Sequence, residues 1–173
     1  MHNIEESRRQ KDEFFRSSHH SPLLPEQKTD FHGLRYFPPN PELELAVEVE
    51  RFPQGDEVLM QTNTGDVQRY ARFGRFTLQV GEEEAALTIY RNENGYFLPF
   101  TDSLAGTETY GAGRYLEPEL LPDGRFAVDF NLAYNPYCAY NEAWSCPITP
   151  AENRLKLPIR AGEMVFYPPS AAI

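Results

Sequence analysis

The sequence lacks a long apolar run and an N-terminal targeting pattern. No segment of its 173 residues approaches the roughly 18 consecutive apolar residues of a membrane-spanning helix. The first residues, MHNIEESRRQKDEFF, are charged and contain no apolar core of a secretory signal. We therefore expect a cytoplasmic protein, in which the two cysteines are reduced and not bridged.

Positive charge is also scarce. The chain has 16 Lys and Arg against 26 Asp and Glu, a formal net charge of −10. Binding to a phosphate backbone or to an anionic membrane surface needs clustered basic residues. We therefore expect no nucleic-acid partner and no membrane partner, and the sequence leaves the oligomeric state open.

The common cofactor and metal motifs are missing as well. Neither GxxxxGK[ST] nor GxGxxG occurs, so no phosphate-binding loop is predicted. Cys138 and Cys146 are eight residues apart, which is not the spacing of a zinc ribbon. Of the four histidines, only His32 lies beyond the first 20 residues. We assign no metal ligands and no cofactor from the sequence.

What is present indicates one globular domain. Hydrophobic residues make up 40% of the chain and aromatic residues 13%, enough for a sizeable core. Residues 1–30 form a predicted helical arm. Within it, residues 4–16 have strong helix formers, with acidic residues early and Arg late. Residues 31–173 form a predicted β domain that makes one globular unit with this arm.

Beyond residue 42 the pattern has a period of two. Residues 43–49, LELAVEV, alternate in polarity as a half-buried strand does. Further predicted strands are Glu57–Thr62, Val67–Phe73, Phe76–Val80, Ala85–Arg91, Tyr96–Phe100, Phe126–Asn131 and Met164–Tyr167. The sequences NTGD, FGR, VGEEE, NENG and PDGR are the predicted turns between strands.

These elements predict a mainly β protein. The expected fold is a single-domain antiparallel β-barrel or β-sandwich-like fold with an N-terminal helix and a long irregular C-terminal segment. Residues 132–160 show no clear periodicity. An ordered loop of that length is usually functional or packs as a cover over the core.

One predicted strand has two different faces. In Phe126–Asn131 the apolar residues share one face, and Asp129 and Asn131 share the other. If both faces are covered, these two side chains point into a polar pocket. If only one is covered, they point to solvent at a strand end.

A second candidate segment is FLPFTDSLAGTETYGAGRYLEPE, residues 97–119. Asp102, Glu108, Tyr110 and Arg114 stand among glycines that permit tight turns. Arg114 could orient an anionic or carbonyl group of a ligand. The alternative is a loop that is held by an ion pair between Arg114 and a carboxylate, for example Glu108 or Asp129.

The third segment, FNLAYNPYCAYNEAWSCP at residues 130–147, contains both cysteines and the only tryptophan. Tyr134, Asn135, Tyr137 and Cys138 are its candidate site residues. Asparagine and proline also stabilise turns, and tyrosine can bury its ring and keep its hydroxyl hydrogen-bonded. The segment therefore fits either part of a pocket or an irregular lid that packs without regular pairing.

Seven stretches carry a resemblance to one family. They are KDEFFR at 11–16, SPL at 21–23, FHGLRYFP at 31–38, FLPFTD at 97–102, GTETYGAGRYL at 106–116, DFNLAYNPYCAY at 129–140 and CPITPAENRLKLPIRAGE at 146–163. The chain resembles, nearly end to end, the uncharacterised bacterial and archaeal proteins of domain of unknown function 1684. SLAGTETY stands where ATSGTETY is expected. The resemblance implies a compact, mostly β domain and implies no activity.

Our leading hypothesis is a small-molecule-binding protein or an enzyme of unassigned reaction, with a polar and aromatic pocket at one end of the β domain. Asp129 or Glu108 would be the acid–base group and Cys138 a nucleophile. The predicted ligand-binding residues are Asp102, Tyr110, Arg114, Asn131, Tyr134, Asn135 and Tyr137. The alternatives are a catalytic or metal site centred on the cysteines, and a structural or protein-interaction module.

Overall fold

The computed structural model describes residues 3–53 and 56–166, which form two antiparallel sheets and two α-helices. The strands are β1 (Glu44–Val47), β2 (Glu50–Arg51), β3 (Glu57–Gln61), β4 (Val67–Val80), β5 (Glu83–Asn92), β6 (Gly95–Phe100), β7 (Arg114–Leu116), β8 (Glu119–Leu120) and β9 (Phe126–Asp129). The large sheet has the order β2-β4-β5-β6-β7, with β3 also paired to β4, and the small sheet has the order β1-β9-β8. The described strands close no barrel, and the mainly β, sandwich-like prediction is confirmed.

The predicted N-terminal helix is confirmed as α1 (Ile4–Ser17), and the short α2 (Pro25–Thr29) follows it. The Asn3 side chain accepts the N–H of Glu6 and so caps α1. Phe15 is buried near the end of α1, whereas Phe14 is exposed, and Arg8 in the middle of the helix donates to the carbonyls of Phe37 and Asn131. Neither described helix is both long enough and apolar enough to cross a bilayer.

Strand β4 differs from its prediction. The FGR sequence was expected to be a turn between two strands, but Val67–Val80 is one strand with a bulge between Arg72 and Gly74. A Cβ on Gly74 would lie 2.7 Å from the backbone oxygen of Glu50. A glycine is therefore needed at position 74 because β2 approaches closely, and the chain does not reverse there.

Two predicted strands in the C-terminal part of the chain also differ from the structure. The predicted strand Phe126–Asn131 stops at Asp129 and continues as a 3₁₀ turn, Phe130–Leu132. Residues 164–166 of the predicted last strand form no strand, and Tyr167 lies outside the described residues. Strands β2, β7 and β8 were not predicted, because two or three residues are too few to show a period.

Alternation along the strands creates two apolar clusters on opposite faces of the large sheet. The inner core lies against the small sheet and includes Ile89, Leu98, Leu116 and Val128. On the other face lies a group that we call the tyrosine cluster. It contains Met60, Tyr70, Tyr90, Phe97, Tyr115, Cys138 and Cys146.

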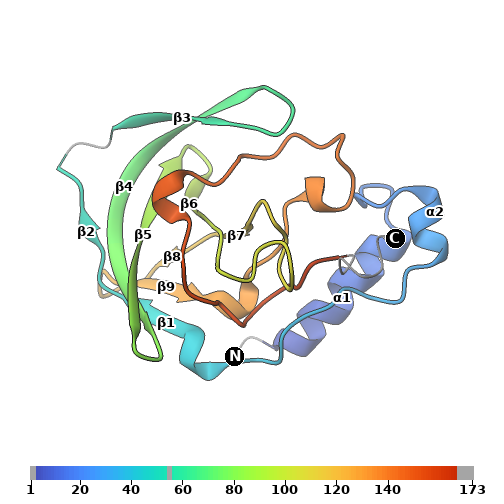
Figure 1. The fold of residues 1–173 in the computed structure, drawn as a ribbon, viewed down its shortest axis with the longest axis horizontal. Helices are drawn as coiled ribbons and strands as arrows, with labels where there is room; N and C mark the ends of the chain where they lie inside the picture. The colour runs from blue at the N-terminus through green and yellow to red at the C-terminus, as the bar shows by residue number, and fades with distance from the viewer. Residues whose placement is uncertain (1–2, 54–55, 167–173) are drawn as a thin grey trace.

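The long irregular segment covers the tyrosine cluster, which is one of the two roles expected for a segment without periodicity. It contains two further 3₁₀ turns, Tyr137–Ala139 and Ala151–Asn153. In Figure 1 this orange-to-red chain winds across the molecule, between the bent β4–β5 hairpin on one side and the helices at the opposite end. The part of the large sheet around Tyr90 and Phe97 is therefore buried on both faces, whereas Arg75, Thr77 and Gln79 of β4 are exposed.

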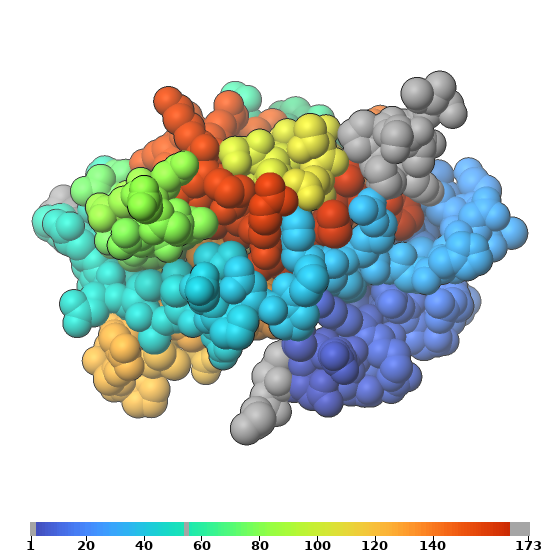
Figure 2. Space-filling model, turned by 60° about the horizontal axis from the view of Figure 1, so that its bottom comes forward, coloured from blue at the N-terminus to red at the C-terminus, as the bar shows by residue number. Residues whose placement is uncertain are grey.

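Residues 31–43 connect the helices to the sheets. Figure 2 shows this stretch, in blue-cyan, crossing one face of the molecule beside the red C-terminal segment. The N–H of Phe37 donates to the carbonyl of Gly162, and that of Met164 donates to Arg35. The start and the end of the β domain are thus joined by backbone hydrogen bonds.

Candidate functional site

Asp102 and Arg114 lie together in the interior. Both side chains are 1% exposed, and the guanidinium Nη2 stands 3.6 Å from Asp102 Oδ2. Arg114 also donates to the carbonyls of Ile159, Ala161 and Glu163, which fixes the chain after the irregular segment. Burial lowers the pKa of Arg114 to about 10, so the side chain stays charged at neutral pH.

Asp102 has no free carboxylate oxygen. Oδ1 accepts the hydroxyl of Thr109 at 2.7 Å, and Oδ2 accepts the N–H of Ile159 at 2.8 Å. The carboxylate that holds Arg114 is therefore Asp102, and not Glu108 or Asp129 as the alternative suggested. Glu108 instead pairs at the surface with Arg160, 2.8 Å away.

Asp129 and Asn131 bond to one another at the end of β9. Asp129 Oδ1 accepts the backbone and side-chain N–H groups of Asn131, at 3.0 and 2.9 Å. The Asn131 amide also donates to the carbonyl of Asn40 and accepts its N–H. This pair fastens the end of β9 to the chain before β1.

Asn135 belongs to a buried network around Glu163. The Glu163 carboxylate, 1% exposed, accepts Lys11 Nζ at 2.9 Å, the Asn135 N–H at 2.9 Å and the Tyr140 hydroxyl at 2.6 Å. Neither Glu163 nor Lys11 was predicted as a site residue. Their positions inside the stretches KDEFFR and CPITPAENRLKLPIRAGE were the available signal.

Tyr134 and Tyr137 each pack against another aromatic ring. The Tyr134 hydroxyl donates to Glu117, and its ring faces Tyr115 at 6.0 Å between centroids. The Tyr137 ring packs edge-on against Trp144, 5.1 Å away. Burial raises the pKa of Tyr134 and of Tyr137, so neither is a ready proton donor at neutral pH.

The remaining predicted residues, Tyr110 and Cys138, lie in the tyrosine cluster. The Tyr110 oxygen is 3.7 Å from Cys138 Sγ. Cys146, which we did not assign to the site, is adjacent: its sulfur accepts the N–H of Cys138 at 3.4 Å. The ten predicted residues therefore form several local clusters and do not converge on one pocket.

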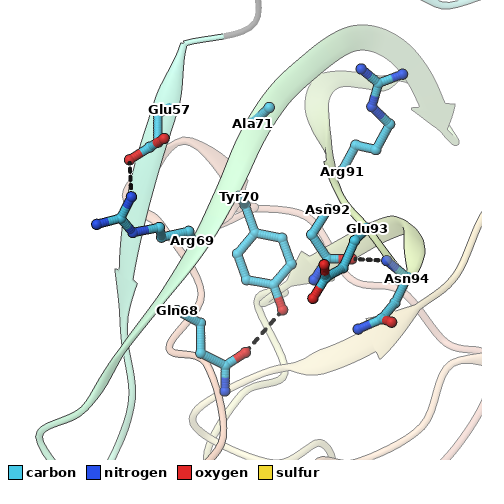
Figure 3. A pocket seen from close by; sticks show the side chains of 9 residues that line it. All are labelled: Glu57, Gln68, Arg69, Tyr70, Ala71, Arg91, Asn92, Glu93 and Asn94. Atoms are coloured by element: carbon cyan, nitrogen blue, oxygen red, sulfur yellow. Dashed lines mark hydrogen bonds and ion pairs between the residues drawn. The ribbon is translucent and has the colours of Figure 1, made fainter.

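An open hollow lies elsewhere, at the edge of the large sheet (Figure 3). Its volume is about 640 Å³. Its lining residues are Glu57, Gln68, Arg69, Tyr70, Ala71, Arg91, Asn92, Glu93 and Asn94. They come from β3, from β4 and from the end of β5 with its turn into β6.

Tyr70 lies at the centre of this hollow. Its hydroxyl donates to Gln68 Oε1 at 3.1 Å, and the antiparallel register that pairs Ala71 with Arg91 brings Tyr70 beside Asn92. Figure 3 shows the tyrosine ring between Gln68 and the asparagine-containing turn. The ring is held by Phe97, whose centroid is 5.2 Å away in a stacked arrangement.

A second depression of about 320 Å³ adjoins the first. The two share Tyr70, Asn92 and Asn94, and we call them together the outer groove. The second depression extends to Tyr115, Glu117, Tyr134 and Pro147. Of the ten predicted residues, only Tyr134 lines the outer groove.

Part of the outer groove could be predicted from the sequence. Period-two alternation places Gln68 and Tyr70 on one face of β4, and the turn NENG places Asn92 and Asn94 at a hairpin end. The sequence does not show that these two pairs of residues come together in the fold. That depends on the pairing register of β4 with β5, which one sequence does not fix.

The described residues contain no group of three or more His, Cys, Asp and Glu side chains that could hold a metal ion. Comparison with family models gives a match to residues 29–164, by the description Protein of unknown function (DUF1684). The chain belongs to this family. The resemblance that the sequence motifs indicated is thereby confirmed.

A solved structure similar to this chain is that of an uncharacterised protein of Haloarcula marismortui, determined by solution NMR. It is 34% identical, with a TM-score of 0.70, over 93% of this chain and 91% of that one. The search among curated proteins finds no match. The family therefore supplies a shared fold for this chain and no activity.

Proposed function

We propose that this protein of the DUF1684 family binds a small, uncharged, polyhydroxylated molecule, such as a sugar or a nucleoside, in the outer groove. The observation that supports this is the Tyr70 ring flanked by the amide side chains of Gln68, Asn92 and Asn94. An aromatic ring packs on the apolar face of such a ligand, while amides both donate and accept hydrogen bonds.

The size of the groove agrees with this ligand class. Its larger part, about 640 Å³, is within the range of roughly 300–1,000 Å³ that is usual for small-molecule sites. The smaller part continues past Tyr115 and Tyr134, so a ligand of two rings has room to extend along the groove. Stacked and edge-on ring pairs hold the floor in place before a ligand arrives.

The charge of the larger part of the groove favours a neutral ligand. The larger part has two carboxylates, Glu57 and Glu93, and two guanidinium groups, Arg69 and Arg91. Glu57 and Arg69 already face each other at 3.4 Å. Because the two signs balance, neither an anion nor a cation has an electrostatic preference there.

The proposal concerns binding, and the reaction stays unassigned. Asp129 lies in a different depression, with Leu116 and Leu132, and Glu108 is paired with Arg160. The catalytic roles of Asp129, Glu108 and Cys138 and the ligand roles of the buried residues therefore stay predictions. Ligand binding in the outer groove does not depend on these roles, and it can be tested first.

The test is a ligand screen by NMR on the isotope-labelled protein, with a panel of monosaccharides, disaccharides and nucleosides. We expect a ligand whose addition shifts the amide signals of Tyr70 and Asn94. Replacing the exposed Asn94 by alanine should weaken that binding about tenfold, which corresponds to roughly 1.4 kcal/mol. Tyr70→Phe, which removes only the hydroxyl, should weaken it less.

Gln79→Ala is the matched control, because Gln79 is an exposed amide residue on the same strand and does not line the groove. Its affinity should equal that of the wild type. A ligand that shifts only signals outside the groove would contradict the proposal. So would equal losses in Asn94→Ala and Gln79→Ala, or a panel in which no compound binds.

A further inference from the structure

The two thiols lie side by side although eight residues separate them in the sequence. Cys138 is in the 3₁₀ turn Tyr137–Ala139, and Cys146 follows the next loop. The N–H of Cys138 donates to the sulfur of Cys146 at 3.4 Å, and both cysteines are free. No partner from another part of the fold is needed to complete the pair.

The backbone around Cys146 is fixed. Its N–H donates to Asn63 Oδ1 at 2.8 Å, and its carbonyl accepts the N–H of Asn63 at 3.2 Å. Asn63 belongs to the turn between β3 and β4, so the sulfur of Cys146 is held against the large sheet. The adjacent bridge between Thr62 and Pro147 adds a second connection.

The two sulfurs have different surroundings. Interaction with Cys138, together with backbone N–H groups of Cys138 and Tyr137, lowers the pKa of Cys146. The same interaction and burial raise the pKa of Cys138, whose sulfur faces the Tyr110 hydroxyl at 3.7 Å. Cys146, whose sulfur receives the N–H of Cys138, is therefore the more acidic thiol of the pair. This is the difference that a nucleophilic and a resolving cysteine need.

We propose that Cys146 and Cys138 form a redox-active dithiol that reduces a hydroperoxide and closes to an intramolecular disulfide. The Cys146 thiolate attacks one peroxide oxygen, the O–O bond breaks, and an alkoxide or hydroxide leaves and takes a proton. Cys146 is then a sulfenic acid. The Cys138 sulfur next attacks the Cys146 sulfur, and water leaves. The two thiols lose two electrons, which the peroxide gains.

The cover over the pair is thin. Cys138 is 6% exposed and Cys146 8%, but residues 142–145 between them are all exposed. A small peroxide needs only a local opening of this short turn. Trp144 is in the turn, 41% exposed, with its ring against Tyr137. Formation of the disulfide moves this turn, so the fluorescence of Trp144 reports on the reaction.

This inference is independent of ligand binding in the outer groove. The experiment exposes the reduced full-length protein to hydrogen peroxide, stops the reaction by alkylation in acid, and maps the peptides without reduction. We expect the free thiols to fall from two to none, a Cys138–Cys146 disulfide, and a change of Trp144 fluorescence over the same time. The oxidation rate at neutral pH should exceed that of the urea-unfolded chain at least about fivefold.

Two variants distinguish the role of Cys146 from that of Cys138. Cys138→Ser should stop at a sulfenic acid on Cys146, which a dimedone probe captures, and Cys146→Ser should react no faster than the unfolded chain. Near-ultraviolet circular dichroism verifies that both fold. The proposal fails if Cys146→Ser keeps the wild-type rate, if the disulfide joins two chains, or if the folded protein reacts no faster than the unfolded one.

Discussion

The side-chain amide of Asn153 hydrogen-bonds both backbone groups of Thr88. Its Oδ1 accepts the Thr88 N–H at 2.8 Å, and its Nδ2 donates to the Thr88 carbonyl at 2.8 Å and to that of Pro99 at 2.8 Å. The register of β5 and β6, in which Tyr90 faces Phe97, would place Thr88 opposite Pro99. Proline has no N–H to give, so a side chain from the irregular segment completes the ladder.

These hydrogen bonds predict that Asn153→Ala strongly lowers the stability of the protein. The substitution leaves the buried N–H of Thr88 and two carbonyls without partners, so we expect a loss of about 3 kcal/mol in the free energy of unfolding. Urea denaturation measures it. Asn141→Ala is the control, because Asn141 accepts one hydrogen bond in an exposed turn. That variant should lose under about 1 kcal/mol, and equal losses would contradict the role of Asn153.

We expect Arg114 to stabilise the fold, whatever part it has in ligand binding. Arg114→Met removes the donor to three carbonyls and leaves Asp102 as an unpaired buried charge, so we expect a loss of about 3–5 kcal/mol. Arg160→Met breaks an exposed ion pair with Glu108 and should change stability by less than about 1 kcal/mol. Thermal and urea unfolding of both variants test this. A stable Arg114→Met protein would contradict the structural role of Arg114.

Two glycines of the GAG sequence should differ in their tolerance of alanine. Gly113 has φ +109°, and a Cβ there would lie 2.7 Å from the carbonyl of Phe100 and 2.6 Å from the Thr149 hydroxyl. Gly111 has only ordinary contacts at 3.8 Å. We expect Gly113→Ala to lose at least about 2 kcal/mol and Gly111→Ala less than about 1 kcal/mol, by urea denaturation. A reversed order would show that this loop is placed differently.

The buried tyrosines predict a loss of stability in alkali. Burial raises the pKa of Tyr90, Tyr115 and Tyr140 in the folded protein. Their contribution to stability is therefore complete below the unfolded pKa of about 10 and is lost as the pH rises above it. Each should lower the free energy of unfolding by up to about 1.4 kcal/mol per pH unit there.

Urea denaturation across this pH range measures the slope, and ultraviolet absorbance follows phenolate formation. Tyr115→Phe should reduce the slope by one proton, because its hydroxyl is buried and donates to the carbonyl of Pro147. Phenolates that form in the folded protein at the pH at which they form in urea would contradict the prediction.

The sequence was sufficient for the fold class and for the position of α1. Period-two alternation and turn residues are local properties, so residues 43–49 and the hairpin at NENG were readable without a structure. The error at Gly74 arose because a glycine in a turn and a glycine beneath a neighbouring strand look the same in sequence. Only the approach of Glu50 distinguishes them.

The candidate site was less predictable, because partners are chosen over long distances. Chemical type singled out Arg114 and Asn135 as candidate ligand-binding residues, which stays a prediction. It did not show that Arg114 binds the backbone at residues 159–163, or that Asn135 meets Glu163. Likewise the sequence showed two cysteines eight residues apart, and only the 3₁₀ turn at Tyr137–Ala139 makes them neighbours.

The sequence by itself therefore determined the mainly β class, the first helix and most of the longer strands, the absence of the common cofactor motifs, and the unusual polar and aromatic stretches. The tertiary structure decided which polar groups are already satisfied within the fold and which face solvent. The reason is physical: hydrogen-bond partners of buried groups come from segments far apart in the chain. Asn153 with Thr88 and Lys11 with Glu163 are examples. The groove beside Tyr70 is formed in the same way, by residues of β3, β4 and the end of β5, and ligand binding there can now be tested.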